Sequence, residues 1–197
     1  MDVLIDTNFF LWYNYIELRK WGGLIWRQKK ISYFIYFLTL IDGVLNNDKT
    51  QDRVANDYFG ISPELVDNLK ELYDKLVERY GEVKIILSST WKHRWYKTKK
   101  ERQDEFANRL DEALAVVGLE VSGKIGESYF IDRGALIKEY IEADPCDNFV
   151  ILDDRMFDFV EEGLIDHLIH TNESYGLRQS DIDLYFTKKL KNDIIIM

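Results

Sequence analysis

Three apolar runs, each closed by polar side chains, constrain the fold of this chain more than any other feature. The runs are residues 36–41, 83–87 and 149–152, and they end in Asp42-Gly43, Ser88-Ser89-Thr90 and Asp153-Asp154. Short apolar runs that stop at such residues are typical of buried strands in a parallel sheet. Because the carboxyl ends of parallel strands lie along one edge of a sheet, we expect the three polar ends to meet at one site.

Helical patterns separate the three runs. Ser62-Pro63-Glu64 has the composition of a helix start, and apolar residues then recur at helical spacing until Gly81. Further helices are expected near residues 106–117, 133–141 and 180–190, with short strands within residues 119–131 and near residues 168–171. Strands that alternate with helices favour right-handed crossovers, so the sequence predicts an α/β protein with a mainly parallel sheet.

These stretches together resemble the haloacid dehalogenase (HAD) superfamily, in particular the small HAD domain of Swiss-army-knife RNA repair proteins and related phage proteins. The resemblance covers about residues 34–190 and rests on Ile41-Asp42-Gly43-Val44-Leu45-Asn46, Ser88-Ser89-Thr90-Trp91-Lys92, Arg133 with Ile137, and Leu152-Asp153-Asp154. It implies a three-layer, Rossmann-like fold with a mainly parallel sheet. Residues 43–61 would form only a minimal cap, which leaves the site open.

The resemblance also implies a role for each polar strand end. Asp42 would be the catalytic acid and base, and Asp42, Asp153 and Asp154 would hold Mg²⁺. Adjacent carboxylates at a strand end also favour a hard cation on physical grounds, because their repulsion must be offset. The phosphate-binding residues would be Ser88, Ser89, Lys92 and Arg133, with Lys138 as a second candidate for the position of Arg133.

One position departs from the family pattern. The family's nucleophile is an aspartate two residues before Asp42, and this chain has Leu40 there. Leucine can neither attack phosphorus nor ligate a metal, and Thr39 faces the opposite side of the sheet unless a bulge re-aims it.

Three hypotheses follow from this substitution. The chain is a HAD-type, Mg²⁺-dependent phosphohydrolase with an altered first motif that acts on a nucleotide or a nucleic acid end. Alternatively, it is a catalytically silent pseudoenzyme that binds phosphate, nucleic acid or a protein. The third hypothesis is a metal nuclease similar to PIN domains, because Leu4-Ile5-Asp6-Thr7-Asn8 resembles the opening of that family; Asp6 would then act with Asp42 and Asp153.

A basic and aromatic segment follows the second polar strand end. Residues 91–102, from Trp91 to Arg102, contain six basic residues and one acidic residue, a net charge of +5 in a chain of net charge −9. His93, Trp95 and Tyr96 lie among these charges. Cations mixed with aromatic rings suit a phosphate backbone with stacked bases, so this segment is a candidate nucleic acid contact. A solvated surface loop is the alternative interpretation.

Composition sets the outer limits. A chain of 197 residues with 46% hydrophobic residues is expected to be globular, with residues 1–30 as an N-terminal extension packed on a HAD-like domain of residues 31–197. The single cysteine, Cys146, excludes an intramolecular disulfide and suits a reducing compartment. The longest apolar run is too short to span a bilayer, so we expect a cytoplasmic protein with no membrane partner.

Overall fold

The computed structural model describes residues 34–39, 41–98, 104–128, 132–146 and 148–195. The predicted N-terminal extension, with Asp6, lies outside these residues, and so does Leu40. The proposed boundary between residues 1–30 and 31–197 therefore stays a prediction.

The described residues form a five-stranded sheet in which every pair of neighbours is parallel. The strand order is β5 (Val121–Lys124), β4 (Glu82–Leu87), β1 (Phe34–Thr39), β6 (Phe149–Asp153) and β7 (Leu168–His170). Because β1 lies between β4 and β6, the three predicted strands are neighbours, as their polar ends require. The expectation of a mainly parallel α/β sheet is confirmed.

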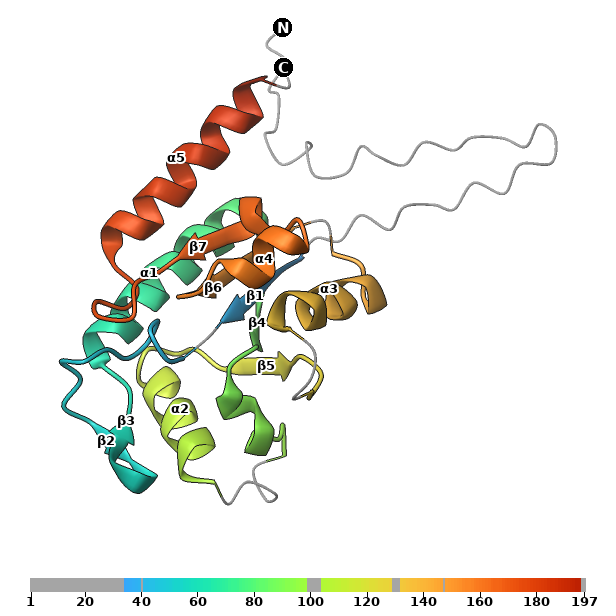
Figure 1. The fold of residues 1–197 in the computed structure, drawn as a ribbon. Helices are drawn as coiled ribbons and strands as arrows, with labels where there is room; N and C mark the ends of the chain where they lie inside the picture. The colour runs from blue at the N-terminus through green and yellow to red at the C-terminus, as the bar shows by residue number, and fades with distance from the viewer. Residues whose placement is uncertain (1–33, 40, 99–103, 129–131, 147, 196–197) are drawn as a thin grey trace, which may run out of the picture. The chain divides into compact units, whose positions relative to one another are not determined.

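Helices cover both faces of the sheet, and strand alternation decides which side chains meet them (Figure 1). On one face, Ile35 and Phe37 of β1 pack in a core with α1 (Pro63–Tyr80), α2 (Glu105–Val116) and α5 (Gln179–Ile195). On the other face, Tyr36 and Leu38 pack with α3 (Arg133–Ala143) and α4 (Phe157–Glu161). The result is the three-layer arrangement that the sequence predicted.

The helix boundaries follow local chemistry closely. Pro63 is the first residue of α1, where its missing N–H costs nothing, and the N–H of Gly81 closes the helix on the carbonyl of Val77. Ser62 occupies the expected cap position, but its side chain makes no capping hydrogen bond with the described residues. No helix in the described ranges is long and apolar enough to cross a membrane.

A small hairpin after β1 is the minimal cap that the resemblance implied. Strands β2 (Arg53–Val54) and β3 (Tyr58–Phe59) pair antiparallel around η2 (Ala55–Asp57), and we call residues 53–59 the flap. Asn56 and Asp57 have φ of 61° and 62°, a conformation that asparagine and aspartate tolerate better than most residues. A flap of this size leaves the adjacent edge of the sheet accessible.

Candidate functional site

The carboxyl ends of β4, β1 and β6 meet at one edge of the sheet. Thr39 pairs with Leu87 and with Leu152, and the backbone N–H of Ser88 donates to the carbonyl of Thr39 at 3.0 Å. Asp153 is the next residue of β6. The register therefore brings the polar ends of three strands together, as predicted.

Asp153 and Arg133 form a buried ion pair at this edge. Asp153 is fully buried, and alternation along β6 puts it on the same face as Ile151, towards the start of α3. There it accepts a hydrogen bond from the guanidinium of Arg133, the first residue of α3. The backbone N–H of Arg155 donates to the other carboxylate oxygen at 2.9 Å. Burial raises the pKa of Asp153, and the charge of Arg133 opposes that rise.

Ser88 and Lys92 supply a hydroxyl and a second cation. Ser88 is buried, and its hydroxyl has no hydrogen-bond partner among the described residues. Lys92 is only 5% exposed, and burial lowers the pKa of its ammonium group. The positive charge of Arg133 lowers that pKa further, so the two cations repel one another. An anion held between them would relieve this repulsion.

Ser89, in contrast, has an evident structural task. It is buried at the N-cap of η3 (Thr90–Arg94), where its hydroxyl oxygen accepts from the backbone N–H of Trp91 at 3.2 Å. The hydroxyl proton stays available to a ligand. The structure therefore shows Ser89 as the N-cap of η3. Its contact with phosphate stays a prediction.

Part of the basic and aromatic segment is buried, and not on the surface as we expected, whereas Tyr96, Lys97 and Thr98 are exposed and residues 99–102 lie outside the described ranges. Trp91 and Trp95 belong to the hydrophobic core, and Lys92 is buried with them, because the turn of η3 folds these side chains inwards. The indole N–H of Trp95 donates to Asp111 at 3.2 Å. The interpretation of Trp95 as a surface ring is wrong. Tyr96 is the exposed aromatic residue of this stretch.

Lys138 is excluded from the site as the second candidate for the position of Arg133. Its ammonium lies 2.9 Å from the carboxylate of Glu162, with the lysine side chain 47% exposed. This surface pair joins α3 to the end of α4, and the hydrogen bond raises the pKa of Lys138.

Asp42 is exposed at the end of the central strand and is held by Asn46. The side-chain amide of Asn46 donates to Asp42 at 3.1 Å, and its carbonyl oxygen accepts from the backbone N–H of Gly43 at 3.0 Å. The same amide donates to the carbonyl of Phe59 in the flap at 3.3 Å. Asn46 therefore ties the catalytic candidate to the flap. No role was predicted for Asn46 from the sequence, although its spacing of four residues from Asp42 is a signal of such a contact.

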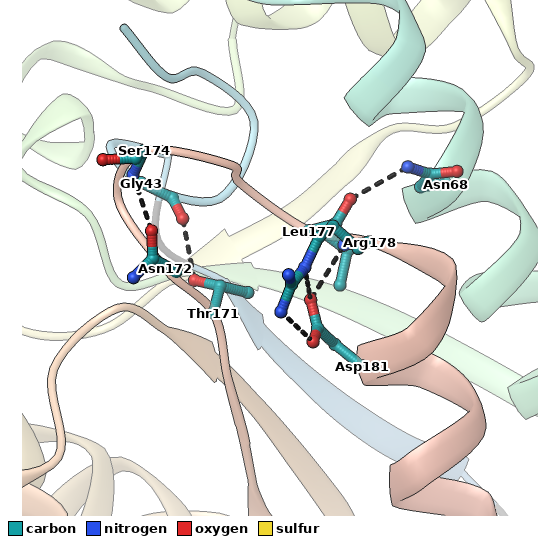
Figure 2. A network of polar contacts seen from close by, with 8 residues as sticks. All are labelled: Gly43, Asn68, Thr171, Asn172, Ser174, Leu177, Arg178 and Asp181. Carbon is teal, nitrogen blue, oxygen red and sulfur yellow. Dashed lines mark hydrogen bonds and ion pairs between the residues drawn. The ribbon is translucent and has the colours of Figure 1, made fainter.

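The loop between β7 and α5 supports the turn that carries Asp42 (Figure 2). The hydroxyl of Thr171 donates to the carbonyl of Gly43 at 2.7 Å, and the N–H of Leu177 donates to the carbonyl of Val44 at 2.9 Å. Asn68 of α1 in turn donates to the carbonyl of Leu177 at 2.9 Å. A segment more than 120 residues away in sequence thus fixes the turn.

The three carboxylates predicted to hold Mg²⁺, those of Asp42, Asp153 and Asp154, make different contacts in the structure. In the part of the chain that the structure describes, no three His, Cys, Asp or Glu side chains gather as ligands. Asp42 is bonded to Asn46, and Asp153 is bonded to Arg133. One oxygen of Asp154 is buried without a hydrogen-bond partner among the described residues. Of the three carboxylates, Asp154 is therefore the one best placed to coordinate a metal. Magnesium therefore stays a prediction from the family resemblance.

Gly43 has no side chain, which allows Asp154 to pack against the turn. This contact predicts that a substitution at Gly43 destabilises the fold. A Cβ at Gly43 would lie 2.6 Å from a carboxylate oxygen of Asp154, and the backbone φ is +69°. Gly163 has nearly the same φ, +71°, but a Cβ there would meet none of the described atoms within 4 Å. We expect Gly163→Ala to lower the free energy of unfolding by about 1 kcal/mol, the cost of the left-handed backbone.

Gly43→Ala should cost at least about 2 kcal/mol more than this control, because Asp154 must also move. Urea unfolding of both variants gives the comparison. Equal losses in the two variants would contradict the close packing of Asp154 on Gly43.

Comparison with known families agrees with the geometry. A family model described as the HAD domain in Swiss Army Knife RNA repair proteins matches residues 40–182. The match begins at Leu40 and includes Asp42, Ser88, Arg133 and Asp153. A search of curated proteins finds no match to the chain. The family match covers well over half of the sequence, and the parallel sheet with helices on both faces is the architecture that this family implies. The chain therefore belongs to the family of HAD domains found in Swiss Army Knife RNA repair proteins.

Proposed function

We propose that this protein binds the phosphate ester of a nucleotide or a nucleic acid end at the carboxyl edge of β1, β4 and β6. We further propose that Leu40 leaves it without the covalent phosphoryl transfer of HAD phosphohydrolases. The observation that carries the proposal is the buried Ser88 hydroxyl, unpartnered among the described residues, on the segment that also carries buried Lys92. Arg133 adds a second cation, and its positive charge lowers the pKa of Lys92.

Phosphate suits these three groups better than a neutral ligand does. Its oxygens accept from a hydroxyl, an ammonium and a guanidinium, and bonds between charged partners are the stronger ones. A bound dianion would stabilise the protonated form of Lys92, whose pKa is lowered by burial and by Arg133. Ser88 would donate one hydrogen bond, and Lys92 would offset the charge together with Arg133, whose guanidinium is shared with Asp153.

Hydrolysis without a covalent intermediate is the second candidate function. Asp42 is exposed, and Asn46 orients its carboxylate, so it is placed to accept a proton from an attacking water. This route needs no nucleophile at position 40, but it gives up the gain that a covalent intermediate provides. A cytoplasmic location and a role in nucleic acid repair are parts of the proposal, supported by the lone Cys146 and by the family description.

The proposal predicts that Ser88→Ala weakens phosphate binding without destabilising the fold. Loss of one hydrogen bond to a charged ligand should reduce affinity for inorganic phosphate about tenfold, measured by titration calorimetry. The free energy of unfolding should not fall, because the hydroxyl has no partner to lose among the described residues. Affinity should also fall as salt concentration rises, since the cations dominate binding.

Ser62→Ala is the matched control, because Ser62 is a partly buried serine whose side chain makes no capping hydrogen bond with the described residues. It should leave phosphate affinity unchanged. A wild-type protein that binds no phosphate, or a Ser88→Ala variant with unchanged affinity, would overturn the proposed site.

A further inference from the structure

A cavity of about 280 Å³ lies beside Asp42, on the side of the flap. Three aromatic rings line it, from Tyr58 of the flap, Trp91 of η3 and Phe106 of α2. Thr90, His93 and Asp104 supply polar groups to the same lining. We call this cavity the aromatic pocket.

The three rings are ordered by contacts with one another. The ring of Phe106 meets Trp91 edge-on, with centroids 5.0 Å apart, and Tyr58 edge-on at 6.1 Å. Trp91 is buried, whereas Tyr58 is 63% exposed. Tyr58 therefore exposes much of its ring to solvent while it also packs against Phe106. A flat ligand ring stacked on Tyr58 would cover that area.

The aromatic pocket and the proposed phosphate site are built from one segment. Ser88 and Lys92 belong to the phosphate site, and Thr90, Trp91 and His93, between or beside them in sequence, line the pocket. Asp42 also lines the pocket, at the end of the central strand. A ligand with its phosphate on Ser88 would thus have its remaining part close to the rings.

We propose that the aromatic pocket binds the nucleobase next to the phosphate that the protein recognises; this inference rests on the proposed phosphate site. A base offers a planar face to Tyr58 and hydrogen-bonding groups along its edge. The hydroxyl of Thr90 can donate and accept along such an edge. His93, which lies 3.6 Å from Glu127, and Asp104, which caps α2, add polar atoms to the same lining. A phosphotyrosine ring has no polar edge groups beyond its phosphate ester, so these three side chains favour a nucleobase.

The pocket is held in place by contacts around its rim. Asp104 caps α2 by accepting from the N–H of Phe106 at 3.0 Å. Asp52, at the base of the flap, accepts from the N–H of Ile61 at 3.1 Å and lies 3.4 Å from the guanidinium of Arg109 on α2. These contacts join the flap to α2, so the pocket is formed before a ligand enters. A pre-formed pocket loses less entropy on binding.

A series of ligands measured by titration calorimetry tests the inference. The series is inorganic phosphate, ribose 5-phosphate, adenosine 5′-monophosphate and uridine 5′-monophosphate. Wild-type protein should bind the two nucleotides at least about tenfold more tightly than ribose 5-phosphate, as expected for one stacked base. Tyr58→Ala should bring this ratio close to one, and Tyr58→Phe should keep most of it, because stacking needs the ring and not the hydroxyl.

Phe157→Ala is the matched control, because Phe157 is an aromatic residue on α4 that is 83% exposed and does not line the pocket. It should leave the ratio unchanged. If phosphate and ribose 5-phosphate bind but the nucleotides bind no tighter, the nucleobase pocket is overturned while the phosphate site stands. If inorganic phosphate does not bind, the proposed function itself fails. Phosphotyrosine that binds as tightly as the nucleotides would also overturn recognition of a base edge.

Discussion

Leu40→Asp should convert this protein into a phosphatase that hydrolyses p-nitrophenyl phosphate in the presence of Mg²⁺. The substitution restores the aspartate that the family uses as nucleophile, two residues before Asp42. Loss of a covalent nucleophile can cost on the order of a millionfold in rate, so the gain should be several orders of magnitude above wild type. The variant should also bind Mg²⁺ more tightly than wild type, since it regains a carboxylate at the site.

Leu40→Asn is the matched control, because it introduces a polar side chain of the same shape as aspartate without the attacking carboxylate. It should stay inactive. A wild-type protein as active as Leu40→Asp would show that Leu40 does not silence the site, and the non-covalent route through Asp42 would then be favoured. A folded Leu40→Asp variant that binds phosphate but hydrolyses nothing would show that other residues of the site also prevent catalysis.

The adjacency of the three main strands could be predicted because each of them carries a strong local signal. The apolar runs that became β4 and β6 begin and end within one residue of the expected positions. Their adjacency to β1 followed from the helical segments between them and from the preference for right-handed crossovers. The first run differs from the prediction at Ile41, an apolar residue that lies in a turn and not in β1. Ile41 instead accepts turn hydrogen bonds from Val44 and Leu45.

The contacts that define the site could not be predicted, because they join residues far apart in the sequence. Asp153 meets Arg133 across 20 residues, and Thr171 meets Gly43 across 128. Trp95 illustrates the same limit: Arg94 and Lys97 lie within two residues of it in sequence, yet its side chain is buried in the core and bonded to Asp111 of α2. Hydrophobic patterning identifies which segments are helices and strands, but side-chain partners depend on how those segments pack.

The second large effect concerns the ion pair of Arg133 and Asp153. Arg133→Met should lower the free energy of unfolding at neutral pH by about 3–5 kcal/mol, because it leaves a fully buried carboxylate without its cation. Lys138→Met is the matched control on the same helix, since Lys138 forms an exposed pair with Glu162. That control should leave the free energy of unfolding nearly unchanged, because exposed ion pairs contribute little.

The deficit of Arg133→Met should depend on pH in one direction. Burial raises the pKa of Asp153, and removal of Arg133 takes away the charge that opposes this rise, so the pKa climbs further in the variant. A group whose pKa is raised in the folded state contributes stability that is lost as pH rises through that pKa. The variant should therefore be closest to wild type in acid, where Asp153 is protonated in both proteins, and furthest from it at neutral pH.

Asp153→Asn in the Arg133→Met background isolates the buried charge as the cause. The second substitution removes the carboxylate and keeps the shape of the side chain, so the double variant should regain part of the lost stability and lose the pH dependence. The effects of the two changes should then be strongly non-additive, as expected for residues in direct contact. Urea unfolding at several pH values measures wild type, Arg133→Met, Asp153→Asn and the double variant. If Arg133→Met is no less stable than Lys138→Met, or if the double variant is less stable than Arg133→Met alone, the cation of Arg133 is not what allows Asp153 to be buried at the end of β6.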